Sequence, residues 1–186
     1  MDETPRLQWK QALITLAVAL VVAFILNWGI LKLFGEKSPY RAEHGLVGIA
    51  LLMGFVFIHP AKEGNSAKAV GFFAFALIPS YLGTVFPDLD IRLCGIGCHR
   101  NPLFHSGLSF LILLCLVRHQ GVFLQTLAIG YGLGLASHLW WDVVDYGDVR
   151  WLPGGTLDRL WLTVNGLLVL IEAWRRVLNF KVLAAS

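Results

Sequence analysis

Residues 121–142 read GVFLQTLAIGYGLGLASHLWWD, an apolar stretch that ends in a histidine and an aspartate. The stretch has no charged side chain before Asp142, and its length matches the roughly 20 residues that a helix needs to cross a bilayer. Gly130 and Gly134 are four residues apart, as are His138 and Asp142, so all four lie on one side of a helix. Glycines at this spacing let helices pack closely in lipid. We therefore expect this side of the helix to face the inside of a bundle and to carry the histidine and the aspartate inward.

The whole chain shares this apolar character. Of its 186 residues, 56% are hydrophobic and 15% are charged, whereas a soluble domain has about 45–50% apolar and about 25% charged residues. The surplus apolar side chains must face something other than water, so we expect the lipid bilayer as a partner. The net charge of +3 is small and spread along the chain. Because nucleic-acid binding needs a basic patch, no nucleic-acid partner is expected.

Six apolar runs predict an all-α fold, a polytopic membrane bundle of about six transmembrane helices. The runs are residues 12–31, 45–59, 69–87, 102–117, 121–141 and 160–174. We interpret the first run as a permanent anchor, because residues 27–31 lack the small-residue pattern of a leader cleavage site. The expected domains are an N-terminal anchor helix with its linker over residues 1–43 and a helical membrane domain over residues 44–186.

Ionisable side chains gather at four places along the chain: at His44 and within residues 87–90, 99–106 and 137–142. If six helices cross the bilayer in alternation, all four places lie at the same membrane face. An ionisable group at membrane depth costs about 2.5–3.5 kcal/mol, so several together need compensation, which a bound cation supplies. Imidazoles and carboxylates are ligands of Zn²⁺, and also of Mn²⁺ and Fe²⁺. The predicted metal ligands are His44, Asp88, Asp90, His105, His138 and Asp142.

Each of these side chains also has an ordinary structural interpretation. The alternatives are a buried hydrogen-bonded pair for His138 and Asp142, a turn for Asp88 and Asp90, a helix cap for His105, and an interfacial position for His44.

The order of the polar elements is distinctive. An early histidine, His44, opens a helix; Pro-Asp-x-Asp follows at residues 87–90, His-Arg with a later His-Ser at 99–106, and Ser-His-x-x-x-Asp at 137–142. In this order the chain resembles the bacterial inner-membrane-associated metal-dependent hydrolases, some of which are described as LexA-binding. The resemblance covers a little over half of the chain. This chain differs from the family in having five residues between His99 and His105 and a helix before His44.

The resemblance implies a multi-pass hydrolase of the bacterial inner membrane, in which a metal held by His and Asp side chains activates water. From the residues themselves, we expect Asp142 or Asp90 to orient or deprotonate the water, with His99 assisting. Because the site would open at the level of the lipid headgroups, we expect a lipid-borne or phosphoester substrate. Two other functions stay open. One is a non-catalytic membrane protein with a structural metal or a protein partner, consistent with the LexA-binding label; the other is a divalent metal carrier or sensor.

Overall fold

The computed structural model describes residues 4–35, 39–58, 66–145 and 155–184. These residues form α-helices, one short 3-10 helix and connecting turns, with no strand among them. The elements are α1 (Thr4–Leu33), α2 (Pro39–Ile58), α3 (Ser66–Val85), α4 (Leu89–Cys94), η2 (Ile96–Cys98), α5 (Leu108–Val117), α6 (Val122–Val144) and α7 (Thr156–Ala184). The all-α fold class is therefore confirmed.

Each of the six apolar runs contains a helix. The lengths and hydropathies of the described helices do not support six membrane crossings. By length and hydropathy, α6 alone among the described helices could cross a bilayer, and 67% of its apolar window is buried inside the protein. Shorter apolar helical stretches are Ala17–Leu33, Ala69–Val85 and Leu108–Val117. With ten residues, α5 is about 15 Å long, half of the roughly 30 Å hydrocarbon core.

The short α5 also places His105 outside the helix predicted over residues 102–117, and the helix cap is Gly107 and not His105. The side chain of Asn101 accepts a hydrogen bond from the Leu103 amide at 3.0 Å, and the Asn101 carbonyl accepts one from the His105 amide at 2.8 Å. Asn side chains that bond to the main chain two residues on stabilise turns in place of helices. The chain therefore turns between residues 101 and 107, and His105 lies on this turn, before α5.

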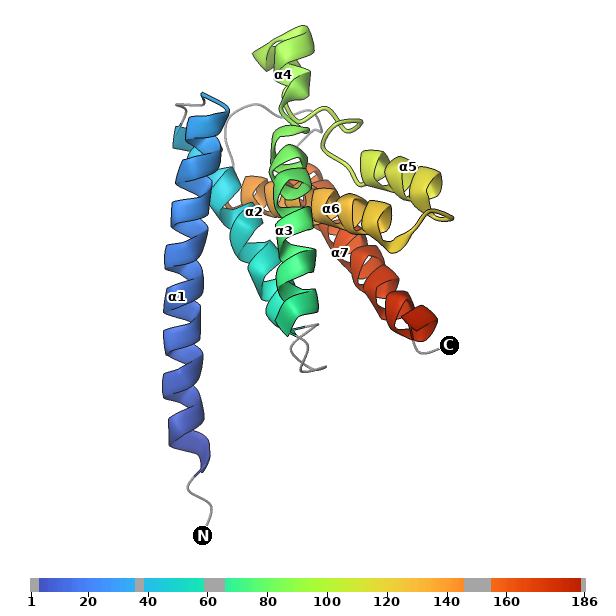
Figure 1. Cartoon of the computed structure of the whole chain (residues 1–186). Coiled ribbons are helices and arrows are strands. Elements are labelled where there is room, and N and C mark those ends of the chain that lie inside the picture. The colour runs from blue at the N-terminus through green and yellow to red at the C-terminus, as the bar shows by residue number, and fades with distance from the viewer. Residues whose placement is uncertain (1–3, 36–38, 59–65, 146–154, 185–186) are drawn as a thin grey trace.

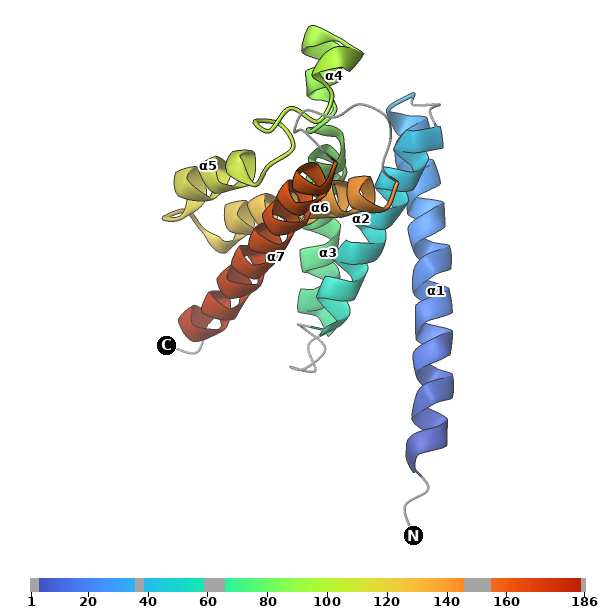
Figure 2. The same cartoon turned by 180° about the vertical axis from the view of Figure 1, so that it is seen from behind.

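The helices differ in direction (Figure 1). α1 lies on the outer side of α2, and α2 lies between α1 and α3; α1 and α3 are upright in the view and α2 slants. α6 passes across α3, and α7 packs against α6 on the side away from α3, as Figure 2 shows from behind. Six helices that alternate up and down, as the sequence predicted, are thus replaced by an arrangement in which α6 lies across its neighbours. The predicted domain boundary between residues 43 and 44 falls inside α2, which begins at Pro39.

The crossing of α3 and α6 depends on glycine. A Cβ atom at Gly130 would lie 2.8 Å from Ala76 Cα, and one at Gly134 would collide with the Ser80 carbonyl oxygen. Neither position accepts a side chain, because the main chains of the two helices touch there. The predicted close approach at Gly130 and Gly134 is confirmed. It fixes the end of α6 beside the end of α3.

Candidate metal centre

Five parts of the chain meet at the end of α3. They are the first turns of α2, the turn after α3 with α4, the segment after η2, the turn before α5 and the last turns of α6. Together they bring to one place every side chain that the sequence marked as ligand or catalytic group. These are His44, Asp88, Asp90, His99, His105, His138 and Asp142.

One half of the centre joins α2 to α6. The ligand atoms of His44, His138 and Asp142 all lie within 4.8 Å of one another. His138 Nε2 is 3.4 Å from Asp142 Oδ2, and His44 Nε2 is 3.7 Å from Asp142 Oδ1. The imidazoles of His44 and His138 stack with their centroids 4.1 Å apart. This group could hold one divalent ion.

The other half is built by α4 and the two turns that follow it. The ligand atoms of Asp88, His99 and His105 also lie within 4.8 Å of one another. Asp90 lies beside them, with its Oδ1 3.6 Å from His99 Nδ1 and its Oδ2 3.2 Å from His105 Nδ1. This group has the donor set for a second ion.

The two halves are adjacent. His105 Nε2 lies 3.3 Å from Asp142 Oδ2, and His138 Nε2 lies 3.8 Å from Asp88 Oδ1. His105 therefore has one ring nitrogen toward Asp90 and the other toward Asp142. The arrangement is one continuous His/Asp centre with room for ions at two neighbouring positions.

Several polar atoms inside this centre form no hydrogen bonds with one another, which is what a cation site would require. Among the described residues, buried atoms without a hydrogen-bonding partner include Asp90 Oδ1, His138 Nε2, Asp142 Oδ2 and both ring nitrogens of His105. Buried polar atoms in native proteins are almost always satisfied, and exceptions call for an explanation such as a bound ion. A bound ion at either of the two neighbouring positions would explain these atoms, because imidazole nitrogens and carboxylate oxygens are ligands of divalent cations.

The pKa values of His105 and Asp90 are shifted because imidazoles and carboxylates lie close together in the centre. Burial disfavours the imidazolium form of His105, but the Asp142 and Asp90 carboxylates outweigh burial and raise its pKa to about 9. Burial alone raises the pKa of Asp90, yet the neighbouring His105 and His99 and the Asn101 amide at 3.1 Å hold it below its usual range. In the absence of metal, a proton on His105 thus takes part of the role of a cation.

Two hydrogen bonds to main-chain carbonyl groups position residues of the centre. His138 Nδ1 lies 2.8 Å from the Thr84 carbonyl oxygen. A carbonyl only accepts, so Nδ1 carries the proton and Nε2 presents its lone pair to the centre. On the turn before α5, the Trp161 indole donates a hydrogen bond to the His105 carbonyl oxygen at 2.9 Å. Neither Thr84 nor Trp161 was predicted from the sequence.

Two arginines that were not among the predicted site residues, Arg41 and Arg100, also border the centre. Arg41 Nη1 lies 2.6 Å from Asp88 Oδ2. Arg100 is buried, has a left-handed main chain with φ of 63°, and donates from Nη2 to the carbonyl oxygens of Asp142 and Asp145 at 3.5 and 3.3 Å. Their positions in the sequence could have indicated that they lie near the centre, because Arg41 is one helical turn before His44 and Arg100 directly follows His99.

Comparison with known proteins adds a family without adding a function. Residues 67–179 match the family described as Domain of unknown function (DUF5942). No curated protein and no solved structure matches the chain. The matched residues include every candidate ligand of the centre except His44, and they cover more than half of the 186 residues. The chain therefore belongs to the DUF5942 family.

Proposed function

We propose that this protein is a membrane-embedded, metal-dependent hydrolase. The observation that carries the proposal is the buried His/Asp centre, in which nitrogen and oxygen atoms of His105, His138 and Asp142 face one another without hydrogen-bonding partners. Zn²⁺ is the proposed metal, with Mn²⁺ and Fe²⁺ as alternatives, held by His44, Asp88, Asp90, His105, His138 and Asp142. A divalent ion in such a site acidifies water and polarises the bond to be cleaved.

Hydrolysis adds the hydroxyl of water to the electrophilic atom and its remaining proton to the leaving group. The proposed base is Asp142 or Asp90, whose inward oxygens have no hydrogen-bonding partner among the described residues. His99 is the candidate for delivering the proton to the leaving group. Its side chain is 18% exposed, whereas those of His105 and His138 are fully buried, so His99 lies nearest the entrance of the centre.

The charge around the centre supports an anionic substrate. Arg41 and Arg100 bring positive charge beside Asp88 and Asp142. Guanidinium groups match phosphate geometry, and we propose a lipid-borne phosphoester as the substrate for this reason. The order of the polar elements, similar to that of the inner-membrane-associated hydrolases, supports the same reaction class.

The outer surface supports placement in a membrane, which we propose to be the bacterial inner membrane. Large apolar side chains are exposed on helices along the whole chain, including Val18, Phe24, Phe75, Leu116, Val164 and Leu168. Exposed apolar areas of this extent on a protein mark contact with a membrane or a partner. In this proposal α1, α2, α3, α6 and α7 are embedded in the bilayer, and α5 enters it without crossing.

A metal with a purely structural role is the second candidate. The centre joins α2, α4, the turn before α5 and α6, so an ion there would tie these parts together even without catalysis. A protein partner would then carry the function.

Metal analysis of detergent-purified protein tests the proposal. We expect near-stoichiometric Zn²⁺, Mn²⁺ or Fe²⁺ in the wild type, loss of metal in His138→Ala, and unchanged metal in His119→Ala, a matched control at an exposed turn. Hydrolysis of a panel of phosphoesters and phospholipids should follow the metal content. Metal-free protein of full thermal stability would contradict the metal site. Bound metal without hydrolysis would favour the structural role, and metal flux into liposomes would favour a carrier.

A further inference from the structure

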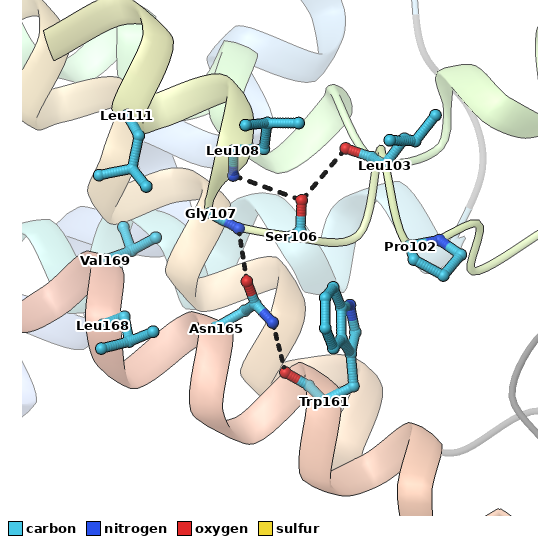
Figure 3. Close-up of a pocket in the computed structure, with 10 residues that line it drawn as sticks. All are labelled: Pro102, Leu103, Ser106, Gly107, Leu108, Leu111, Trp161, Asn165, Leu168 and Val169. Carbon is cyan, nitrogen blue, oxygen red and sulfur yellow. Dashed lines mark hydrogen bonds between the residues drawn. The ribbon is translucent and has the colours of Figure 1, made fainter. Parts of the chain in front are cut away.

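A cavity of about 320 Å³ lies on the far side of the turn that carries His105. Its walls are the turn before α5, the first residues of α5 and one face of α7, and Figure 3 shows the side chains that line it. Binding sites for small molecules range from about 300 to 1,000 Å³, so this cavity has room for one slender group.

The lining selects against a polar ligand. Leucine, valine and proline make most of it, and its two polar side chains, Ser106 and Asn165, are already hydrogen-bonded within the protein. Ser106 Oγ donates to the Leu103 carbonyl at 3.2 Å and accepts from the Leu108 amide at 3.3 Å. Asn165 Oδ1 accepts from the Gly107 amide at 3.0 Å. The binding free energy of a ligand there comes from burying hydrocarbon, at about 0.8 kcal/mol per CH₂ group, and not from hydrogen bonds.

The cavity opens onto an apolar surface. Leu103, Leu111 and Leu168 line it and are 64%, 51% and 58% exposed, so each has one side in the cavity and the other outside. The apolar surface continues along α5 through Ile112 and along α7 through Val164, both of them exposed. In the proposed membrane placement, the groups that meet this rim are the acyl chains of lipids.

The cavity and the His/Asp centre share a wall. The Trp161 ring lines the cavity, and its Nε1 donates to the carbonyl oxygen of His105, whose own ring faces Asp90 and Asp142. Ser106, the next residue, lines the cavity. A chain held here lies against the segment that positions a metal ligand.

From these four features we infer that the cavity binds one acyl chain of a membrane lipid, and that this lipid is the substrate of the centre. The assignment rests on the proposed hydrolase function and narrows its substrate to a chain-bearing lipid. The cleaved bond then lies in the polar part of the lipid, since the cavity admits only hydrocarbon.

Photo-crosslinking tests the binding step apart from catalysis. The probe is a lysophospholipid with a diazirine in its acyl chain, added to detergent-purified protein treated with EDTA. Peptide mapping should place the label on residues 102–111 and 161–169. Leu168→Trp, which fills the cavity, should lower labelling there several-fold. Leu167→Trp, the matched control on the neighbouring exposed position outside the lining, should leave it unchanged.

Labelling spread evenly over α1, α5 and α7 and unaffected by Leu168→Trp would overturn the inference, because it describes ordinary lipid contact. The wild-type map gives this answer even where a variant fails to fold. A different result would contradict the hydrolase proposal alone. In that case the label is found in the cavity in both the wild type and His138→Ala, but the wild type hydrolyses no phospholipid. If phospholipids are hydrolysed but Leu168→Trp changes KM equally for long-chain and chain-free phosphoesters, the cavity is not the chain site.

Discussion

The Nδ1 atom of His138 lies 2.8 Å from the Thr84 carbonyl oxygen, which ties the last turns of α6 to the last turn of α3. The bond fixes the proton on Nδ1 and turns Nε2 toward Asp142 and Asp88. It forms only because the two helices cross without side chains between them at Gly130 and Gly134. The geometry of the candidate metal centre therefore depends on glycines, which have no side chain that could bind a metal.

Gly134→Ala should damage both the fold and the centre. The added methyl group collides with the Ser80 carbonyl, and overpacking of this kind costs about 1–3 kcal/mol. We expect a lower Tm in detergent and less bound metal. Gly54→Ala is the matched control, because a Cβ atom there meets nothing within 4 Å and alanine favours helix by up to about 1 kcal/mol. Equal Tm values for the two variants would show that the crossing does not hold the centre.

The stability of the metal-free protein should fall as the pH rises. The pKa of His105 is raised from 6.5 to about 9 in the folded protein, so its contribution to stability is complete below pH 6.5 and is lost as the pH rises through about 9. Metal binding should show the opposite trend, since a ligand imidazole must be neutral. Tm measured from pH 6 to pH 10, with EDTA and with Zn²⁺, checks both trends. His105→Gln should remove the fall in EDTA, and a flat wild-type profile would contradict the assignment.

Arg41→Gln should destabilise the metal-free protein more than it destabilises the metal-bound one. The Arg41 guanidinium lies 2.6 Å from Asp88 in a largely buried ion pair, and leaving a buried charge without its partner costs about 1–3 kcal/mol. A metal ion would compensate Asp88 in its place, so added Zn²⁺ should raise Tm more in the variant than in the wild type. Arg175→Gln is the control, because Arg175 is 71% exposed in its pair with Glu172 and such pairs contribute about 0–1 kcal/mol.

Local patterns were sufficient to predict the helices and the residues that meet. Each apolar run contains a helix, although only residues 108–117 of the run 102–117 are helical. Ionisable residues are so few in this chain that those near helix ends are easily recognised. The predicted ligands were identified by residue type and by the four-residue spacing of His138 and Asp142. The turn-forming role of Asn101, by contrast, appears only in its hydrogen bond to Leu103, and it shortened a helix that hydropathy alone extends.

Non-local features could not be predicted in the same way. The spacing of Gly130 and Gly134 indicates that some helix comes close, but it carries no information that the partner is α3 or that α6 lies across it. Arg41 reads as a positive flank of an apolar run, and its pairing with Asp88 exists only in three dimensions. Thr84 acts through its carbonyl group, which every residue has.

Asp142→Asn is the sharpest test of the centre, because it removes a charge while nearly preserving the shape of the side chain. Asp142 Oδ2 lies 3.3 Å from His105 and 3.4 Å from His138 and links the two halves of the centre. We expect metal affinity to fall by at least about tenfold, since even groups that only support a ligand contribute 10–100-fold, and hydrolysis to be lost with it. Asp145→Asn, at an exposed position three residues further on, is the matched control and should retain both. Full metal content in Asp142→Asn would remove this carboxylate from the ligand set and leave Asp88, His99 and His105 as the remaining candidate group.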